Sequence, residues 1–384
     1  MQRLPVLSRE AISDDLLRNW PLSYLREIQI ELGKQCNVRC IMCYQTDFSP
    51  ATRAAEIIWK ERLAPAYPNA ETISFSGGEP TILPGAIHLL KTVLDGYPHL
   101  KLNAVSNGIQ FKGIWEDAFL KMGGELNISL NAVSPDVYAK VVQFGRQQDV
   151  MANIDRLIAR RASEGSNLWL RISMVVLDET VQELGDFIQW AADHGIDEVM
   201  FHTDYLSGIR RTPAETVRKH VAHAYDVADR NPQVRIQLLE SFDRVFALQH
   251  GLEPIRPQAA KPRATRPCNI PFDYIAINPD GSAFPCCKSW YTIGNLVKSD
   301  LQTVWTSPAA YKFRRRMLGM DFGNCMVACD MNANPAHPKI ADARKAVAVF
   351  RREPKSAVKK GLRRFGLTSA QIELPEGVKP KATA

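Results

Sequence analysis

Residues 26–45 read REIQIELGKQCNVRCIMCYQ, and this stretch decides how the rest of the chain is interpreted. Segment 26–32 alternates polar and apolar residues with a period of two, which is the pattern of a half-buried β-strand. Three cysteines follow it directly, as Cys36-x3-Cys40-x2-Cys43. The sequence therefore predicts a loop rich in thiols just after a first strand.

Five more segments outward from this stretch read as strands, at 71–78, 100–108, 125–133, 168–176 and 198–206. Helical patterns lie between them, and several end in glycine, the usual helix stop. Six strand–helix units in a row predict an α/β fold with a parallel sheet and right-handed crossovers. The periodicity fits an open doubly wound sheet and part of a barrel equally well. In both, active sites lie at the carboxyl ends of the strands.

The composition is that of an ordinary globular protein, with 384 residues, 45% apolar and 23% charged. No apolar run reaches the ~18 residues of a membrane span, and the N-terminal residues lack a secretory signal. We therefore expect a cytoplasmic protein whose cysteines are not disulfides. Its eight cysteines form two groups, three within residues 36–43 and five from Cys268 onward, which indicates two metal or catalytic sites.

The first cysteine group has the chemistry of an iron–sulfur site. Three thiolates at this spacing bind three corners of an iron–sulfur cube and leave a fourth iron open to a substrate or cofactor. A structural zinc site is an alternative, but it normally has four protein ligands, and the next histidine is His88. Cysteines that merely pack together are a second alternative.

At these residues the chain resembles radical S-adenosylmethionine (SAM) enzymes, whose signature is a Cys-x3-Cys-x2-Cys loop after the first strand. Gly77-Gly78-Glu79-Pro80, after the second predicted strand, resembles the Gly-Gly-Glu-Pro motif of that family. The resemblance covers about residues 25–207. It implies a partial (βα)6 TIM-like barrel, a 4Fe–4S cluster on Cys36, Cys40 and Cys43, and SAM as a second cofactor.

The resemblance also implies cofactor-binding residues. Two glycines let the backbone approach a ligand closely, and the Glu79 carboxylate can accept a charge-assisted hydrogen bond from the SAM ammonium. Arg171 can meet the SAM carboxylate or be a snorkelling edge residue, and the backbone of Met42 is expected near the adenine. Ser129 and Asn131, at alternate positions that point to one face of a strand, match the ribose contacts. The full expected set is Met42, Gly77, Gly78, Glu79, Pro80, Asn107, Ser129, Asn131 and Arg171.

The second cysteine region resembles the SPASM or twitch extension of the same family. FDYIAI and SAFPCC flank NPDG, a hairpin signal, so a small α+β domain is expected. The resemblance implies an auxiliary 4Fe–4S cluster on Cys268, Cys286, Cys325 and Cys329. Neighbours on a strand face opposite ways, so only one of Cys286 and Cys287 can serve, and the Gly-x4-Cys spacing favours Cys286. Five cysteines suffice for one cluster, as in the twitch type, and a four-cysteine zinc site stays open as an alternative.

The expected domains are an N-terminal extension (1–24), the radical SAM core (25–207), a helical connector with a Pro/Arg-rich linker (208–267), the SPASM/twitch domain (268–330) and a basic tail (331–384). The tail holds twelve Lys or Arg and four Asp or Glu, so it carries the whole positive charge of the chain. We interpret it as a solvated helix, with contact to an anionic substrate, a carrier or a membrane surface as the alternative. No nucleic-acid-binding motif is present.

The resemblance implies an enzyme that cleaves SAM reductively to a 5′-deoxyadenosyl radical, which abstracts a hydrogen atom from a substrate carbon. A single auxiliary cluster points to oxidation or deoxygenation of a small molecule such as a sugar, cyclitol or aminoglycoside. Alternatives are a ribosomal-peptide maturase that cross-links or epimerises, and a non-catalytic iron–sulfur electron carrier or partner protein. An electron donor such as flavodoxin or ferredoxin is the expected protein partner.

Overall fold

A computed structural model of the chain describes residues 5, 7–8, 11–204, 209–256, 267–289, 291–322 and 325. The expected ligand Cys329, the basic tail 331–384 and most of the Pro/Arg-rich linker lie outside these residues. Among the described residues, no helix is both long enough and apolar enough to cross a membrane.

One ten-stranded sheet, in the order β12-β11-β10-β1-β3-β4-β5-β7-β8-β9, organises the molecule. Its strands are β1 (Glu27–Glu31), β3 (Thr72–Ser76), β4 (Lys101–Ser106), β5 (Gly124–Ile128), β7 (Leu168–Val176), β8 (Glu198–Thr203), β9 (Arg235–Gln237), β10 (Tyr274–Ile277), β11 (Ser282–Phe284) and β12 (Gly294–Asn295). The eight strands from β10 to β9 in this order pair in parallel with one another, whereas β11 and β12 are antiparallel. The six expected strands and the α/β class are therefore confirmed.

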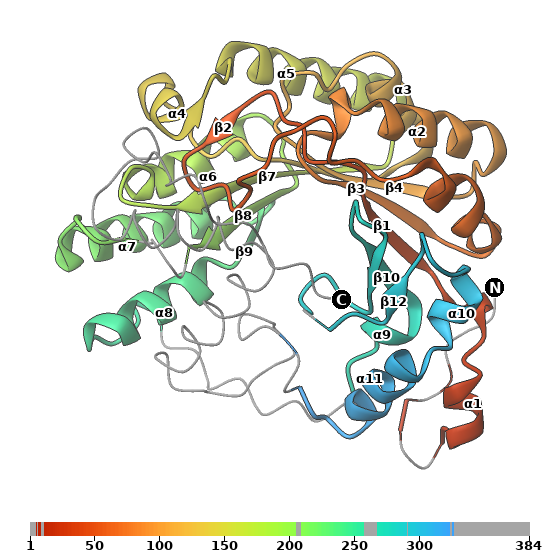
Figure 1. Ribbon diagram of the computed structural model, residues 1–384. Coiled ribbons are helices and arrows are strands. Elements are labelled where there is room, and N and C mark those ends of the chain that lie inside the picture. The colour runs from red at the N-terminus through yellow and green to blue at the C-terminus, as the bar shows by residue number, and fades with distance from the viewer. Residues whose placement is uncertain are drawn as a thin grey trace, which may run out of the picture.

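Helices follow the strands and cover one face of the sheet, as Figure 1 shows. They are α2 (Pro84–Gly96), α3 (Ile114–Met122), α4 (Pro135–Val141), α5 (Gln147–Glu164), α6 (Leu184–Asp193), α7 (Ala214–Arg230) and α8 (Leu239–His250). AEIIWKERLAPAY (55–67), one of the helical patterns between the strands, forms instead a π-turn (Ile58–Arg62) followed by a 3₁₀ turn (Ala64–Ala66). Pro65 lacks the N–H that an α-helix would need there.

The opposite face of the sheet, which we call the inner face, is polar. In β1 the residues Ile28 and Ile30 are fully buried against the helices, so Glu27, Gln29 and Glu31 point to the inner face. The same alternation places Ser74, Asn127 and His202 on this face from three other strands. A parallel barrel sheet normally fills its interior with branched apolar side chains, so this polarity indicates a binding surface rather than a packed core.

The C-terminal region continues the same sheet, which the sequence did not predict. Tyr274 to Ile277 of β10 pair in parallel with Glu27 to Ile30 of β1, and the NPDG turn joins β10 to antiparallel β11, as expected. In Figure 1, β10 lies beside β1, with α9 (Ile270–Asp273), α10 (Leu301–Trp305) and α11 (Pro308–Leu318) next to them. The boundary expected at residue 268 therefore divides a single sheet.

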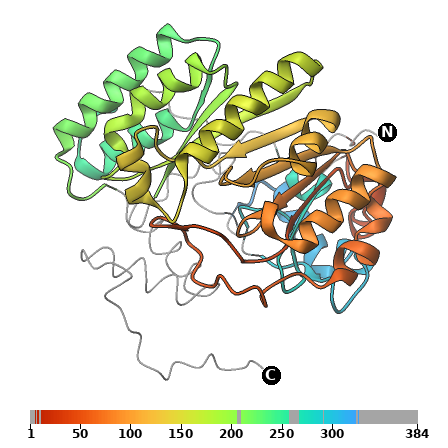
Figure 2. The same cartoon turned by 90° about the horizontal axis from the view of Figure 1, so that it is seen from above.

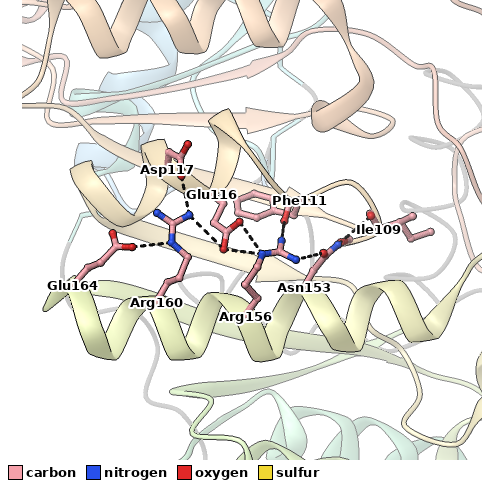
Figure 3. A network of polar contacts seen from close by, with 9 residues as sticks. Ile109, Phe111, Glu116, Asp117, Asn153, Arg156, Arg160 and Glu164 are labelled. Atoms are coloured by element: carbon pink, nitrogen blue, oxygen red, sulfur yellow. Dashed lines mark hydrogen bonds and ion pairs between the residues drawn. The ribbon is translucent and has the colours of Figure 1, made fainter.

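An ion-pair network around the buried Glu116 supports the turn that follows β4. The Glu116 carboxylate on α3 accepts hydrogen bonds from Arg156 Nε on α5 at 3.0 and 3.1 Å. Asn153, one turn earlier on α5, donates to the carbonyl oxygens of Gly108 (2.8 Å) and Ile109 (3.0 Å). Figure 3 shows this chain of contacts between the two helices. The network fixes the backbone immediately after the Ser106-Asn107-Gly108 turn.

Candidate functional site

Three turns meet at the carboxyl ends of β1, β3 and β4. Gly78 N donates to Gly33 O (2.9 Å) and Glu79 N donates to Gln35 O (2.9 Å), so the Gly-Gly-Glu-Pro turn bonds directly to the start of the cysteine loop. Asn107 Nδ2 donates to Asn37 Oδ1 (2.7 Å) and lies 3.9 Å from Cys36 Sγ. The structure thus brings together three motifs that are up to 71 residues apart in sequence.

The two glycines serve this packing. A Cβ on Gly78 would lie 2.0 Å from Gln35 O, and one on Gly77 would lie 2.4 Å from Gly33 O. Gly77 also has a φ of +133°, which side chains rarely adopt. The sequence suggested that these glycines admit a ligand, and in the structure they admit the backbone of residues 33–35.

Glu79 is the centre of the three turns. Its side chain is fully buried, and Oε1 accepts hydrogen bonds from Thr81 N (3.1 Å), Thr81 Oγ1 (2.6 Å) and Ser106 Oγ (2.8 Å). Oε2 accepts one from Asn107 N at 2.7 Å. Burial raises the pKa of this carboxyl, while these hydrogen bonds oppose the rise. Because Glu79 joins the turns in this way, it is a positioning residue.

The cysteine loop is itself held in place from both sides. Its short strand β2 (Arg39–Cys40) pairs antiparallel with β6 (Val142–Gln143), which follows α4. Figure 2 shows the loop crossing towards that helix. Arg39 Nη1 donates to the carbonyl oxygens of Cys36 and Val38, both at 2.8 Å. Cys36, Cys40 and Cys43 are each partly exposed on this loop, and Met42 between them is buried.

The strand alternation predicted for Ser129 and Asn131 is wrong, because β5 ends at Ile128 and Asn131 has a left-handed φ of +62°. Asparagine tolerates this conformation better than most residues. The Asn131 amide donates to Ser129 O (2.9 Å) and accepts from Val175 N (3.1 Å), so it joins the ends of β5 and β7. Ser129 is partly exposed, whereas Asn131 is buried.

Arg171 lies on the inner face, in the first half of β7, and not at a sheet edge. Its guanidinium pairs with Glu198 Oε1 (2.6 Å), which is fully buried, and with Glu125 Oε2 (3.2 Å). Two carboxylates already neutralise this cation, so the snorkelling interpretation is wrong. A contact between Arg171 and the SAM carboxylate would require one of these ion pairs to be exchanged.

Pro80 follows Glu79 directly and begins the short 3₁₀ helix Pro80–Ile82.

The second cysteine group lies at the opposite end of the sheet. Because β11 runs antiparallel to β10, the residues after Phe284 return to the amino ends of β10 and β1. The Cys287 thiol accordingly lies within electrostatic reach of Glu27 and hydrogen-bonds Tyr274, the first residues of these two strands. The five residues of β1 span about 16 Å. The inner face therefore extends between the two cysteine groups.

The expectation that Cys286 and Cys287 face opposite ways is wrong, because the two thiols hydrogen-bond to each other; Cys287 is the exposed member of the pair. β11 ends at Phe284, so Cys286 and Cys287 lie in a turn where strand alternation does not apply. A hydrogen bond to Cys286, together with Tyr274 and Lys288, lowers the pKa of the Cys287 thiol to about 6. Cys325 lies beside this turn, where it forms a β-bridge with Ser289, and Cys268 is buried.

The thiols of the two cysteine groups are the type of ligand that iron–sulfur clusters require. Each group offers thiols that form no disulfides, and Asn107 lies beside Cys36 as a hydrogen-bond donor to sulfur. Among the described residues, no three His, Cys, Asp or Glu side chains are gathered at metal-binding distances. The structure places the thiol-bearing loops, and binding of a cluster would draw the sulfur atoms of each loop together.

Several inner-face residues were not singled out from the sequence. Asn127 is buried and Glu27 is half-buried, and the alternation of their strands shows that both point away from the helices. His202 on β8 is a third, and its burial, with Lys288 and Arg171 nearby, lowers its pKa to about 4. The signal that could have found them is the repeated polar position within apolar strands.

Comparison with known proteins agrees with this arrangement. Residues 30–191 match the model of the radical SAM superfamily, and residues 268–330 match SPASM, an iron–sulfur cluster-binding domain. The first domain implies a 4Fe–4S cluster and SAM as cofactors, and the second implies auxiliary iron–sulfur binding.

Among curated proteins, the chain is similar to GTP 3′,8-cyclases. The one from Haemophilus ducreyi is 24% identical over 233 residues, which cover 54% of this chain and 65% of that protein. The one from Streptomyces coelicolor is 24% identical over 178 residues, which cover 44% and 50%. The chain thus spans between half and two thirds of the length of these relatives.

Among solved structures, the fold is similar to Streptococcus suis SuiB bound to precursor peptide SuiA, with a TM-score of 0.56, 16% identity and coverage of 78% of this chain and 68% of that one. It is also similar to anSMEcpe with bound AdoMet and a peptide, with a TM-score of 0.53, 13% identity and coverage of 88% and 99%. The two family models, rather than these fold similarities, identify the chain: it carries a radical SAM domain, and a SPASM iron–sulfur cluster-binding domain follows it.

Proposed function

We propose that this protein is an enzyme that cleaves SAM reductively and removes a hydrogen atom from a carbon of a small polar molecule, in a net oxidation or deoxygenation. The observation that carries the proposal is the polar inner face, which extends between the two cysteine groups. A substrate bound there would have the SAM site at one end and the auxiliary site at the other.

Cys36, Cys40 and Cys43 would hold the first cluster, and the backbone of Gly77 and Gly78 would face the amino group of SAM. When bound, the cluster and SAM supply a radical that abstracts hydrogen from an unactivated carbon. Glu79 orients this site by fixing the Ser106-Asn107-Gly108 turn against the cysteine loop. Met42, Pro80, Asn107 and Ser129 complete the proposed contacts with SAM.

Cys268, Cys286, Cys325 and Cys329 would hold the auxiliary cluster. Four thiolates leave no iron open to a substrate, so we assign electron transfer to this site. It lies beside Glu27 and Tyr274 at the amino ends of the strands, where it would accept an electron from the substrate. The first electron would come from a flavodoxin or ferredoxin.

Modification of a ribosomal peptide is the second candidate. It is favoured by the fold similarity to SuiB with its precursor peptide and to anSMEcpe with a peptide. At 13–16% identity these likenesses concern the fold alone, and the dense polar groups of the inner face suit a small polar ligand better.

The test is reduction of the anaerobically reconstituted protein with dithionite in the presence of SAM. We expect methionine and 5′-deoxyadenosine, and about eight irons per chain from two four-iron clusters. The Cys268→Ala, Cys325→Ala double variant should retain about four irons and still release 5′-deoxyadenosine. A wild-type protein that carries iron but releases no 5′-deoxyadenosine would support the non-catalytic electron carrier instead.

A further inference from the structure

We propose that the inner face binds a small hydroxylated molecule through a protonated amine, with Glu27 as the counter-ion and Asn127 as a hydroxyl partner. This inference rests on the proposed function and names the substrate class of the same site. It concerns residues of β1 and β5 that lie between the two cysteine groups.

No cation in the described part of the chain forms an ion pair with the Glu27 carboxylate. It lies on the inner face at the start of β1, and among the described residues its only polar partner is the Ser74 hydroxyl, at 3.3 Å. Burial raises its pKa, and the nearby Cys287 and Glu125 raise it further. Holding an unpaired carboxylate here costs folding free energy, so its presence indicates a ligand that carries the missing positive charge.

The neighbouring charges do not supply that cation. Arg171 is shared between Glu198 and Glu125, so one guanidinium already serves two carboxylates. Arg26, at the outer side of this strand end, pairs with Glu71. Lys288 lies beside the Cys287 thiol, whose pKa it helps to lower. Asp273, the last residue of α9, is another carboxyl within electrostatic reach of Glu27, so the surroundings of Glu27 are acidic.

Asn127 supplies the second, independent observation. Its side chain is 8% exposed, and its Oδ1 has no hydrogen-bond partner among the described residues. Leu126 and Ile128 pack against the helices, so Asn127 points to the inner face, two positions along β5 from Glu125. A buried amide oxygen without a partner lowers the stability of the fold, and a ligand hydroxyl would satisfy it.

The surface between these groups suits a polar ring. Tyr274 OH donates to Gln29 Oε1 (2.6 Å), and Gln29 Nε2 donates to Ser76 Oγ (3.4 Å), so hydroxyl and amide groups line the path along β1 and β3. On β4, Val105 points to the same face and is 49% exposed, which shows that solvent reaches it. An amine-bearing polyol matches this combination of one carboxylate, one free amide oxygen and several hydroxyl partners.

The experiment compares D-glucosamine and D-glucose, which differ only in the amine, as probes for the anaerobically reconstituted protein with SAM. Affinities are measured by saturation-transfer NMR titration. We expect glucosamine to bind at least about tenfold more tightly than glucose. Glu27→Gln should abolish this preference, and Asn127→Ala should weaken both probes while the preference stays.

The control variant is Glu56→Gln, a surface glutamate paired with Lys60, which should bind both probes as the wild type does. Because Glu27→Gln removes a half-buried charge that no described cation pairs, its melting temperature should not fall below that of the wild type. A loss of the preference in this variant is therefore not a folding defect.

Equal affinity of the two sugars, no glucosamine binding, or a preference that survives Glu27→Gln would overturn the inference. So would a lysine-containing peptide that binds more tightly than glucosamine through Glu27, since that would assign the amine to a peptide. Release of 5′-deoxyadenosine is measured separately in the same samples. If 5′-deoxyadenosine is released while glucosamine does not bind, the result supports the proposed SAM cleavage and contradicts the proposed substrate class.

Discussion

Gly78 shows how a single missing side chain holds the site together. A methyl group there would lie 2.0 Å from Gln35 O, one residue before Cys36. We expect Gly78→Ala to displace the cysteine loop and to lower 5′-deoxyadenosine formation by about 100-fold, the effect of a displacement of about 1 Å. Gly96→Ala, where a Cβ meets nothing within 4 Å, is the matched control and should be fully active. Equal activity of both variants would show that the loop tolerates the shift.

Glu79 holds the turns through hydrogen bonds: its carboxylate accepts four of them, from Thr81, Ser106 and Asn107. In Glu79→Gln, the new amide N–H group must face at least one of these donors. We expect the free energy of unfolding to fall by about 1.5–3 kcal/mol, the contribution of a hydrogen bond to a charged group, and SAM affinity to fall with it. Denaturant titration and SAM binding provide the two measurements.

Asp243→Asn is the control for Glu79→Gln. Asp243 is also a buried carboxylate, and it accepts hydrogen bonds from Ile255 N (2.9 Å) and Arg256 N (3.2 Å) far from the cysteine loop. It should lose stability to a similar extent and keep SAM affinity. If Glu79→Gln is as stable as the wild type, Glu79 does not hold the turns.

At the scale of elements, the α3–α5 pair supports the site from outside the sheet. Glu116 is nearly fully buried, and Arg156 is its partner. Glu116→Gln should lower the free energy of unfolding by about 1.5–3 kcal/mol, because it removes the charge from two hydrogen bonds. Chemical denaturation measures this. The exposed neighbour Asp117, which pairs with Arg160, should change stability far less when it is replaced by asparagine, and an equal loss would contradict the burial argument.

The strands of the core were predictable because each one alternates. In REIQIEL every second residue is apolar, and in the structure those residues pack against helices. The orientations of Asn131 and Cys287 could not be predicted in this way. The prediction extended the strand alternation past Ile128 and Phe284, where the two strands end. Only the turn that follows a strand determines where such residues point, and the local pattern of residues does not reveal it.

At the scale of the molecule, the joining of β10 to β1 was not predictable either. The apolar run YIAI indicates a buried strand, but nothing in it identifies a partner almost 250 residues away. The join is reinforced by Trp20 Nε1, which donates to Phe272 O (2.8 Å), and by Trp305 Nε1, which donates to Pro21 O (3.3 Å). The two domains thus share one sheet, and the auxiliary site is held in register with β1.

Asp273, next to the pairing of β10 with β1, should make the stability of the protein depend on pH. Burial, and the neighbouring Glu27, raise the pKa of Asp273 from 3.8 to about 7, while Arg26 opposes the rise and Glu71 adds to it. The folded protein therefore binds more protons than the unfolded chain between about pH 4 and 7, and this carboxyl makes the free energy of unfolding fall as pH rises through that range. Denaturation at several pH values should show a steeper fall for the wild type than for Asp273→Asn. Identical pH profiles would contradict this.

The central claim is that SAM binds an open iron of a cluster held by Cys36, Cys40 and Cys43, at the junction of the three turns. Electron paramagnetic resonance of the dithionite-reduced protein, with and without SAM, tests it most directly. We predict that SAM changes the spectrum of one cluster, and that the Cys36→Ala, Cys40→Ala, Cys43→Ala variant loses that signal while the auxiliary signal persists. A spectrum that SAM leaves unchanged, or a SAM-responsive signal that survives in the triple variant, would contradict the account.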